Sequence, residues 1–168
     1  MRGAVVIIGC DPGITGALAI LEGESLVDVF DMPTRTKRVN GADRPVIDEQ
    51  GITDMIHEWA LKGAKRFIIE RVGGLPGQSA PRAFTFGYGF GVVLSVARML
   101  HFDVVQATPL KWRGALEIHS RGRNTKHGSM EQATQFWGDE HWKRVKDHGR
   151  AEAALIALYG ARFIWPAK

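Results

Sequence analysis

Two apolar runs of the sequence each end in an acidic residue. Asp11 follows the run at residues 4–10, and Glu70 follows the run at residues 66–69. A carboxylate at the end of a buried strand is costly unless its charge is compensated, and a bound metal ion is the usual compensation. A turn or capping aspartate is the alternative for Asp11, because a Pro-Gly pair follows it. Two such strand ends in one sheet favour a metal site, because carboxylates in contact repel unless a cation lies between them.

A further acidic position lies near the start of the last expected helix, at residues 146–160. Glu152 precedes an almost wholly apolar run, so we expect it to enter the protein interior and to need a partner there. His148 lies four residues earlier and shares a helix face with Glu152 if the helix already includes it. Asp147 competes with His148 as the fourth metal ligand, and a capping role is the other one open to it. Carboxylate oxygens favour hard cations such as Mg²⁺ or Mn²⁺.

The elements that must position these residues alternate between strands and helices. Strands are expected at residues 4–10, 16–21, 26–30, 66–70 and 102–107, and helices at 48–62, 83–101, from 108, after Lys126 to 137, and at 146–160. Short turns between the first three strands predict an antiparallel meander, and a strand that follows a helix predicts a parallel addition to the sheet. Residues 32–46 are polar and basic and are expected to form a loop. Gly87 and Gly91 lie one turn apart, which predicts a smooth face for a close partner helix, for example from a second subunit.

The composition is that of an ordinary globular protein. The 168 residues are 45% hydrophobic and 24% charged, and we expect one domain over residues 1–168. The single cysteine, Cys10, excludes an internal disulfide and a multi-cysteine zinc site, and it is expected to pack as a small apolar residue. No apolar run is long enough for a bilayer, and no signal-peptide pattern is expected at the N-terminus. These features predict a protein of the cytoplasm, in a bacterial cell or a phage-infected host.

A net charge of +4 points modestly to a polyanionic partner. The glycine-rich loop at residues 71–79 follows Glu70 directly, and such loops let a backbone approach a ligand closely. The aromatic residues at the entry to the next helix could stack on an unpaired base or pack in the core. The basic stretch at residues 119–128 suits phosphate contact, and a solvated loop is the alternative. The candidate DNA-binding residues from these segments are Gly77, Gln78, Phe84, Phe86, Arg121, Arg123 and Lys126.

Three phrases together resemble the RuvC family of Holliday junction resolvases, which have an RNase H-like fold. The phrases are Ile-Gly-Cys-Asp-Pro-Gly-Ile-Thr-Gly at 8–16, Ile-Ile-Glu at 68–70 and Arg-Ala-Glu-Ala at 150–153. The resemblance covers residues 5–161. The Pro-Gly-Gln loop at 76–78 and the Phe-Thr-Phe-Gly helix entry at 84–87 resemble the phage-type members more than the cellular ones.

The resemblance implies an α/β fold with a five-stranded mixed sheet, three strands antiparallel and then two parallel, flanked by helices. It also implies a homodimeric, Mg²⁺-dependent endonuclease of DNA recombination and repair that nicks two opposed strands of a four-way junction. Mn²⁺ could replace Mg²⁺, and neither a small-molecule cofactor nor a membrane partner is implied.

In the implied site of two ions, Asp11 bridges both, Glu70 holds one, and Glu152 with His148 holds the other. Two departures from the family pattern concern metal preference. His148 stands where the family usually has a second acid, and the last acid is glutamate, one methylene longer than aspartate.

Other functions share parts of this pattern. An RNase H-like nuclease could act on other branched DNA or on RNA–DNA hybrids, because the fold does not determine the substrate. An actin-like or sugar-kinase-type ATPase also has an Asp-x-Gly-x-Thr turn between two strands, but such proteins need two domains and a longer chain. An inactive junction-binding protein is a third alternative, against which the retained acids argue.

Overall fold

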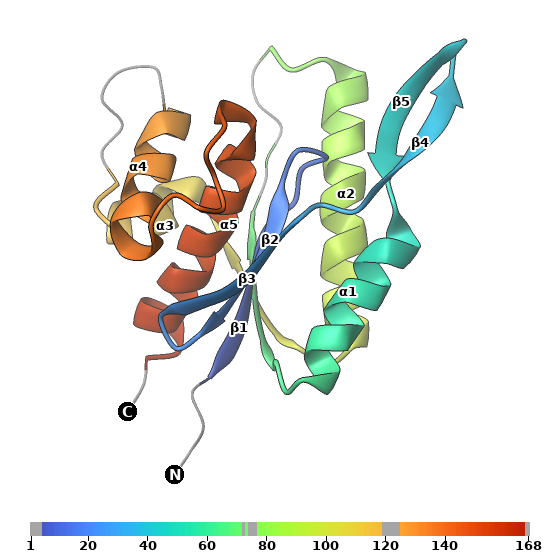
Figure 1. The fold of residues 1–168 in the computed structure, drawn as a ribbon. Coiled ribbons are helices and arrows are strands. Elements are labelled where there is room, and N and C mark those ends of the chain that lie inside the picture. The colour runs from blue at the N-terminus through green and yellow to red at the C-terminus, as the bar shows by residue number, and fades with distance from the viewer. Residues whose placement is uncertain (1–4, 72, 74–76, 119–124, 167–168) are drawn as a thin grey trace.

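A central mixed sheet organises the computed structural model, which describes residues 5–71, 73, 77–118 and 125–166 (Figure 1). Its five strands have the order β3-β2-β1-β6-β7. They are β1 (Val6–Asp11), β2 (Ala17–Glu22), β3 (Ser25–Asp31), β6 (Arg66–Glu70) and β7 (Asp103–Ala107). β1, β2 and β3 pair antiparallel, whereas β6 pairs parallel with both β1 and β7. The predicted sheet, with three antiparallel and then two parallel strands, is confirmed.

Helices cover both faces of this sheet (Figure 1). One face carries α1 (Glu49–Leu61) and α2 (Ala80–Met99). The other carries α3 (Pro109–Ala115), α4 (Thr125–Trp137) and α5 (His148–Tyr159), with a 3₁₀ turn at Val145–Asp147 and a π-helical turn at Gly160–Ile164. In the described part of the chain no helix combines the length and the apolar character that crossing a membrane requires.

The sheet divides the interior into two separate hydrophobic cores. Residues that alternate along β1 point to opposite faces, so Ile7 packs with α5, whereas Ile8 and Cys10 pack with α1 and α2. Cys10 is fully buried and free, as expected for a small apolar residue. Side chains of odd-numbered β1 residues, Asp11 included, therefore belong to the α5 face.

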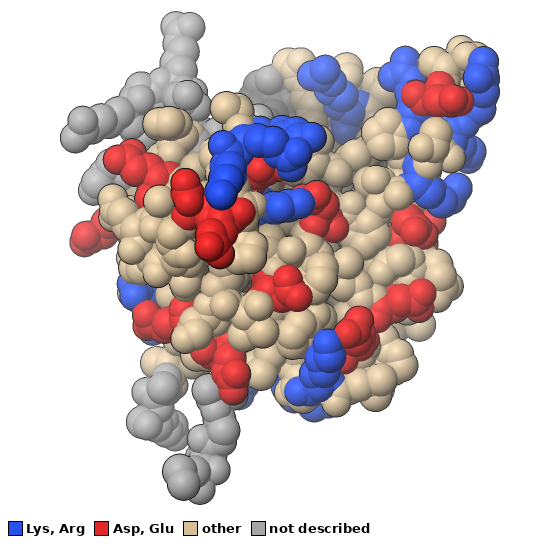
Figure 2. All heavy atoms as spheres, viewed as in Figure 1, with Lys and Arg blue, Asp and Glu red and all other residues tan. Residues whose placement is uncertain are grey.

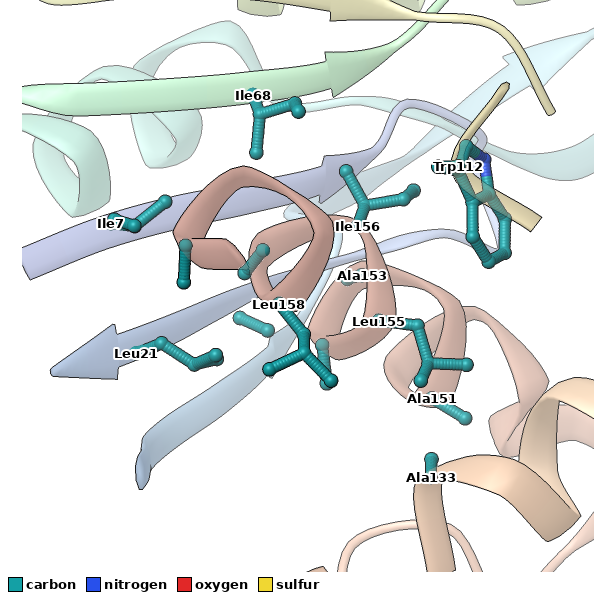
Figure 3. Packing of buried hydrophobic residues seen from close by; sticks show 14 of the residues in the cluster. Ile7, Leu21, Ile68, Trp112, Ala133, Ala151, Ala153, Leu155, Ile156 and Leu158 are labelled. Atoms are coloured by element: carbon teal, nitrogen blue, oxygen red, sulfur yellow. The ribbon is translucent and has the colours of Figure 1, made fainter. Parts of the chain in front are cut away.

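The helix α5 lies between the sheet and α4, so apolar residues surround it. Figure 3 shows Ile156 pointing toward Ile68 of the sheet, while Ala151 and Leu155 point toward Ala133 of α4. A helix buried from two sides has no solvated stripe, which explains its nearly continuous apolar sequence.

The close approach of α5 to β1 depends on Gly9. A Cβ atom at this position would lie 2.6 Å from the Ala157 nitrogen and would overlap the Ala153 carbonyl oxygen. Glycine is required here because the helix backbone occupies the space of a side chain. The same contact sets the height of the α5 N-terminus above the end of β1.

Residues 34–47 correct the expected loop, because they form a β-hairpin. Strands β4 (Thr34–Val39) and β5 (Ala42–Ile47) pair antiparallel in a separate sheet of two strands. Asn40 and Gly41 both have positive φ, +49° and +78°, as a two-residue hairpin turn of type I′ demands. The Asn-Gly pair was the sequence signal for a hairpin, and the polar composition around it obscured that signal.

The boundaries of two helices also differ from expectation. α2 begins at Ala80, with Ser79 before it and a proline in its first turn, so Phe84 lies inside the helix. Lys126 lies within the first turn of α4. In the described chain no atom lies within 4 Å of a Cβ added at Gly87 or Gly91, so no helix packs closely there. A second subunit at this face stays a prediction.

Replacement of Gly9 by alanine should destabilise the protein by about 3 kcal/mol or more, because overpacking of a filled interior costs about 1–3 kcal/mol even where side chains can move, and here backbone must move. Urea unfolding followed by tryptophan fluorescence measures the change. The matched control is Gly91→Ala in α2, which should be neutral or stabilising by up to about 1 kcal/mol. Equal stability of both variants would contradict the close contact between Gly9 and the backbone of α5.

Candidate active site

Asp11 and Glu70 end neighbouring parallel strands and point to the same face of the sheet. The register pairs Cys10 with Ile69, and its continuation places Asp11 level with Glu70. Both side chains alternate onto the α5 face, with Gly9 and Ile68 two residues before them. Each is 9% exposed. The predicted juxtaposition of two strand-end carboxylates is therefore present.

The first turns of α5 bring Glu152 and His148 to the same end of the sheet. Glu152 is 8% exposed, so its expected burial is confirmed, and α5 begins at His148, so the two side chains share a helix face. Gly149 lies against the turn that follows Asp11, because a Cβ there would come within 3.3 Å of Asp11 Oδ2. The positive end of the helix dipole therefore faces the Asp11 carboxylate.

The roles of Asp147 and His148 differ in the structure. Both Asp147 oxygens accept hydrogen bonds from Arg144, whose Nη2 lies 2.8 Å from Oδ1 and whose backbone N lies 3.0 Å from Oδ2. This contact holds the pKa of Asp147 below its usual value. His148 Nδ1 lies 3.1 Å from the Val145 carbonyl oxygen. A ring that donates Nδ1–H to this oxygen keeps Nε2 available as a ligand, the usual second-shell arrangement of metal-binding histidines. We infer that His148 is the better ligand candidate.

Three partners of these carboxylates were missed by the sequence analysis. Trp112, fully buried on α3, donates its indole N–H to Glu70 Oε1 over 2.9 Å. Arg113 forms an ion pair with Glu152 Oε1, to which the Ser129 hydroxyl of α4 also donates over 3.3 Å. No pattern in the sequence predicts these contacts, because α3 and α4 reach the site only through tertiary packing.

The electrostatics of the site disfavour the ionised form of Glu70. The pKa of Glu70 is raised above its usual value, mainly by burial and further by the nearby charge of Glu152. The hydrogen bond from Trp112 and the charge of Arg113 lower the pKa but do not offset this rise. Burial, with the charges of Asp11 and Glu70, also raises the pKa of the Cys10 thiol well above its usual value. Glu70 and Glu152 are therefore close enough for the charge of one to act on the other.

The donor set fits a hard divalent cation in its chemistry. Carboxylate oxygens of Asp11, Glu70 and Glu152 are the ligands that Mg²⁺ and Mn²⁺ prefer, and an imidazole nitrogen is a compatible fourth donor. In the described residues, however, no three His, Cys, Asp or Glu side chains are grouped as they would be around one ion. Glu70 is turned toward Trp112 and Glu152 toward Arg113, so an ion held by Glu152 would share that carboxylate with Arg113.

The predicted DNA-binding residues divide into three groups. Phe86 is partly buried with its ring beside Gly13, next to the candidate site, whereas Phe84 is 75% exposed. Gly77 is exposed with φ of +79°, which favours glycine, and Gln78 is partly buried before α2. Arg121 and Arg123 lie outside the described residues, as does the side chain of Lys126.

Glu70→Gln should stabilise the protein in EDTA at neutral pH, because glutamine keeps the Trp112 contact and removes a carboxylate whose ionised form the fold disfavours. A raised folded-state pKa means that stability is lost as pH rises above the unfolded value near 4.3. The advantage of the variant should therefore grow from about pH 4 to pH 7. Thermal unfolding across this range measures it, with the exposed Glu131→Gln as control. A constant or negative difference would contradict the raised pKa of Glu70.

Asp147→Ala should cost about 1–3 kcal/mol of unfolding free energy, because it leaves the Arg144 contacts unmade. His148→Ala should change stability little and weaken Mn²⁺ binding about 10-fold or more. Urea unfolding and calorimetric Mn²⁺ titration measure the two effects on the same samples. Loss of Mn²⁺ binding in Asp147→Ala at unchanged stability would reverse this assignment.

Known proteins resemble this chain in structure but not detectably in sequence. No family model and no curated protein matches the sequence. Thermus thermophilus RuvC in complex with a Holliday junction substrate superposes with a TM-score of 0.65 at 18% identity, over 95% of this chain and 94% of that one. A second T. thermophilus RuvC structure gives 0.59 at 18% identity, over 95% of both chains. The yeast mitochondrial Holliday junction resolvase Ydc2 gives 0.50 at 16% identity, over 96% of this chain and 80% of that one.

These likenesses extend over nearly the whole chain and agree with the observed order of strands and helices. The resemblance that the three sequence phrases predicted is confirmed at the level of architecture. The chain has the RNase H-like fold of the RuvC resolvases.

Proposed function

We propose that this chain is a metal-dependent endonuclease that resolves four-way DNA junctions by paired, symmetrical nicks. The observation that carries the proposal is that three buried acids, from β1, β6 and α5, lie at one end of the sheet, although their side chains are not grouped around one point in the described residues. A structure with the same fold is a RuvC in complex with a Holliday junction substrate. Acids brought together in this way favour phosphodiester hydrolysis over simple DNA binding, because structure alone does not require them.

The chain's own residues would divide the work at the scissile phosphate. Asp11 would take the central role, with Glu70 as the partner for one ion and Glu152 with His148 as the partners for the other. Two Mg²⁺ ions, or Mn²⁺ in their place, would supply Lewis acidity and lower the pKa of the attacking water. Trp112 holds Glu70 in one orientation through its N–H. Hydrolysis would break the P–O3′ bond, with a 3′-hydroxyl and a 5′-phosphate as products.

Paired nicks require two such sites in one assembly, so the active species would be a homodimer in the cytoplasm of a bacterial or phage-infected cell. Phe86 lies beside Gly13, in the turn that follows Asp11, where it could stack at the unpaired centre of a junction. Contacts to the DNA backbone would come from the loop with Gly77 and Gln78 and from the basic stretch before α4. Affinity from such contacts falls steeply with salt.

A nuclease that acts on other branched DNA or on RNA–DNA hybrids remains the second candidate, because the acids define the reaction and not the shape of the substrate. A phosphate-cradling ATPase receives less support, since its function does not call for buried acids at Glu70 and Glu152. Cleavage of junction, flap, duplex and hybrid substrates side by side separates the two nucleases.

Asp11→Asn should lower metal-dependent cleavage of a synthetic four-way junction by at least about 100-fold, because even second-shell metal partners contribute about 10- to 100-fold. Junction binding in EDTA should remain close to that of the wild type. Gel assays with junction, flap, duplex and hybrid substrates measure both, with Mg²⁺ and Mn²⁺ in turn.

The matched control is Asp54→Asn, which removes an exposed acid on α1. Unchanged cleavage by Asp11→Asn would refute the assigned role. Preference for flaps or hybrids over junctions would replace the resolvase proposal with the second candidate. Nicks on one strand only would argue against the dimer.

A further inference from the structure

A groove separates the β4–β5 hairpin from the N-terminal half of α2. Its lining residues come from both elements and from the start of α1: Arg35, Lys37, Val46, Ile47, Glu49, Phe84, Thr85 and Tyr88. The hairpin extends away from the sheet beyond α2, at the end of the molecule to which β1 points (Figure 1). The acids of the candidate site do not line this groove.

The two faces of the hairpin differ in charge. Cross-strand partners share a face, so the groove-facing Arg35 and Lys37 lie on one face together with Arg44, the partner of Lys37. On the other face, Arg38 is paired with Asp43. Lys37 and Arg44 lie directly opposite each other on the two strands, so two positive charges are neighbours. Neither residue forms an ion pair with any described acid. Such an opposition is destabilising unless an anion joins it. Figure 2 shows Lys and Arg side chains gathered on this hairpin.

The opposite wall of the groove is aromatic. Phe84 is 75% exposed, and its ring stacks on that of Tyr88 at 6.5 Å between centroids and 17° between planes. The Tyr88 hydroxyl and Arg35 both donate to Glu49, which fixes the groove floor. A wall of exposed aromatic rings facing a row of cations is the composition of single-strand nucleic-acid sites, where rings stack on bases and cations contact phosphates.

The groove and the candidate active site flank the same segment of α2. Ile47 of the groove and the Pro12 carbonyl oxygen both lie against Gly89, within 3.4 Å and 3.2 Å of a Cβ added there. Phe86 lies beside Gly13 on the site's side of the helix. The groove and the turn that follows Asp11 therefore border the same half of α2.

We propose that this groove binds an unpaired DNA strand, with phosphates on Lys37 and Arg44 and a base stacked on Phe84, and leads it across α2 to the acidic site. The proposal rests on the proposed action on branched DNA and specifies its substrate, a branch with an unpaired segment. Phe84 would thus serve a second site, separate from that of Phe86.

The test measures binding of a fluorescent thymidine oligonucleotide of about 12 nucleotides to the full chain in EDTA, where nothing is cleaved. Phe84→Ala should weaken binding by roughly 5- to 150-fold, the loss of one stacked base. Lys37→Gln should weaken it severalfold and reduce the slope of log affinity against log salt by about 0.7. Duplex of the same length should compete poorly.

Two matched variants serve as controls. Arg38→Gln removes one charge from the other face of the same hairpin, and Phe163→Ala removes an exposed ring that also stacks on a tyrosine, Tyr159. Both should bind as the wild type does. Equal losses in Arg38→Gln and Lys37→Gln, wild-type binding by Phe84→Ala, or equal competition by duplex would each overturn the groove proposal.

The same samples distinguish failure of the resolvase proposal from failure of the groove proposal. A wild-type chain that cleaves no branched DNA, but whose oligonucleotide binding falls in Phe84→Ala and Lys37→Gln, contradicts the nuclease proposal and supports the groove. If the chain cleaves junctions but both variants bind the oligonucleotide as the wild type does, only the groove proposal is contradicted.

Discussion

The contact between α5 and β1 is the constraint on which the rest of the structure depends. The helix can lie this close only because Gly9 has no side chain where the α5 backbone passes, and Gly149 repeats the device at the turn after Asp11. A helix held farther out would keep its apolar packing with α4 but would withdraw Glu152 and His148 from Asp11. The distance between α5 and β1 therefore determines both how densely the core packs and whether the acids lie at one end of the sheet.

The sequence predicted the sheet and the acids well, because both leave a strong local signal. Buried strands appear in the sequence as short apolar runs. Asp11 and Glu70 stand out because each is an acidic residue at the end of such a run. Glu152 was found for the same reason, inside an apolar helix. The parallel placement of β6 beside β1 then followed from a general rule of connection, so the juxtaposition of the acids needed no further information.

The parts that the sequence did not predict depend on tertiary contacts or on a masked local signal. Residues 34–47 were expected to be a loop because charged residues dominate them, although Asn40-Gly41 is the strongest short hairpin signal. Trp112, Arg113 and Ser129 belong to helices whose docking no pattern reveals. Gly89 lies against Ile47 and the Pro12 carbonyl oxygen, and no spacing rule predicts this contact, because helix rotation decides which glycine faces the interior.

The two separate cores have a consequence for how this protein can change over evolution. The acids lie on the face built with α5, whereas the groove is built from α2 and a hairpin anchored by Ile47 in the other core. Apart from the α2 segment at Gly89, which contacts both Ile47 and the turn after Asp11, substitutions in the two cores should act nearly independently. A lineage could therefore reshape the hairpin, and with it the preferred nucleic acid, while the chemistry on the far side of the sheet stays as it is.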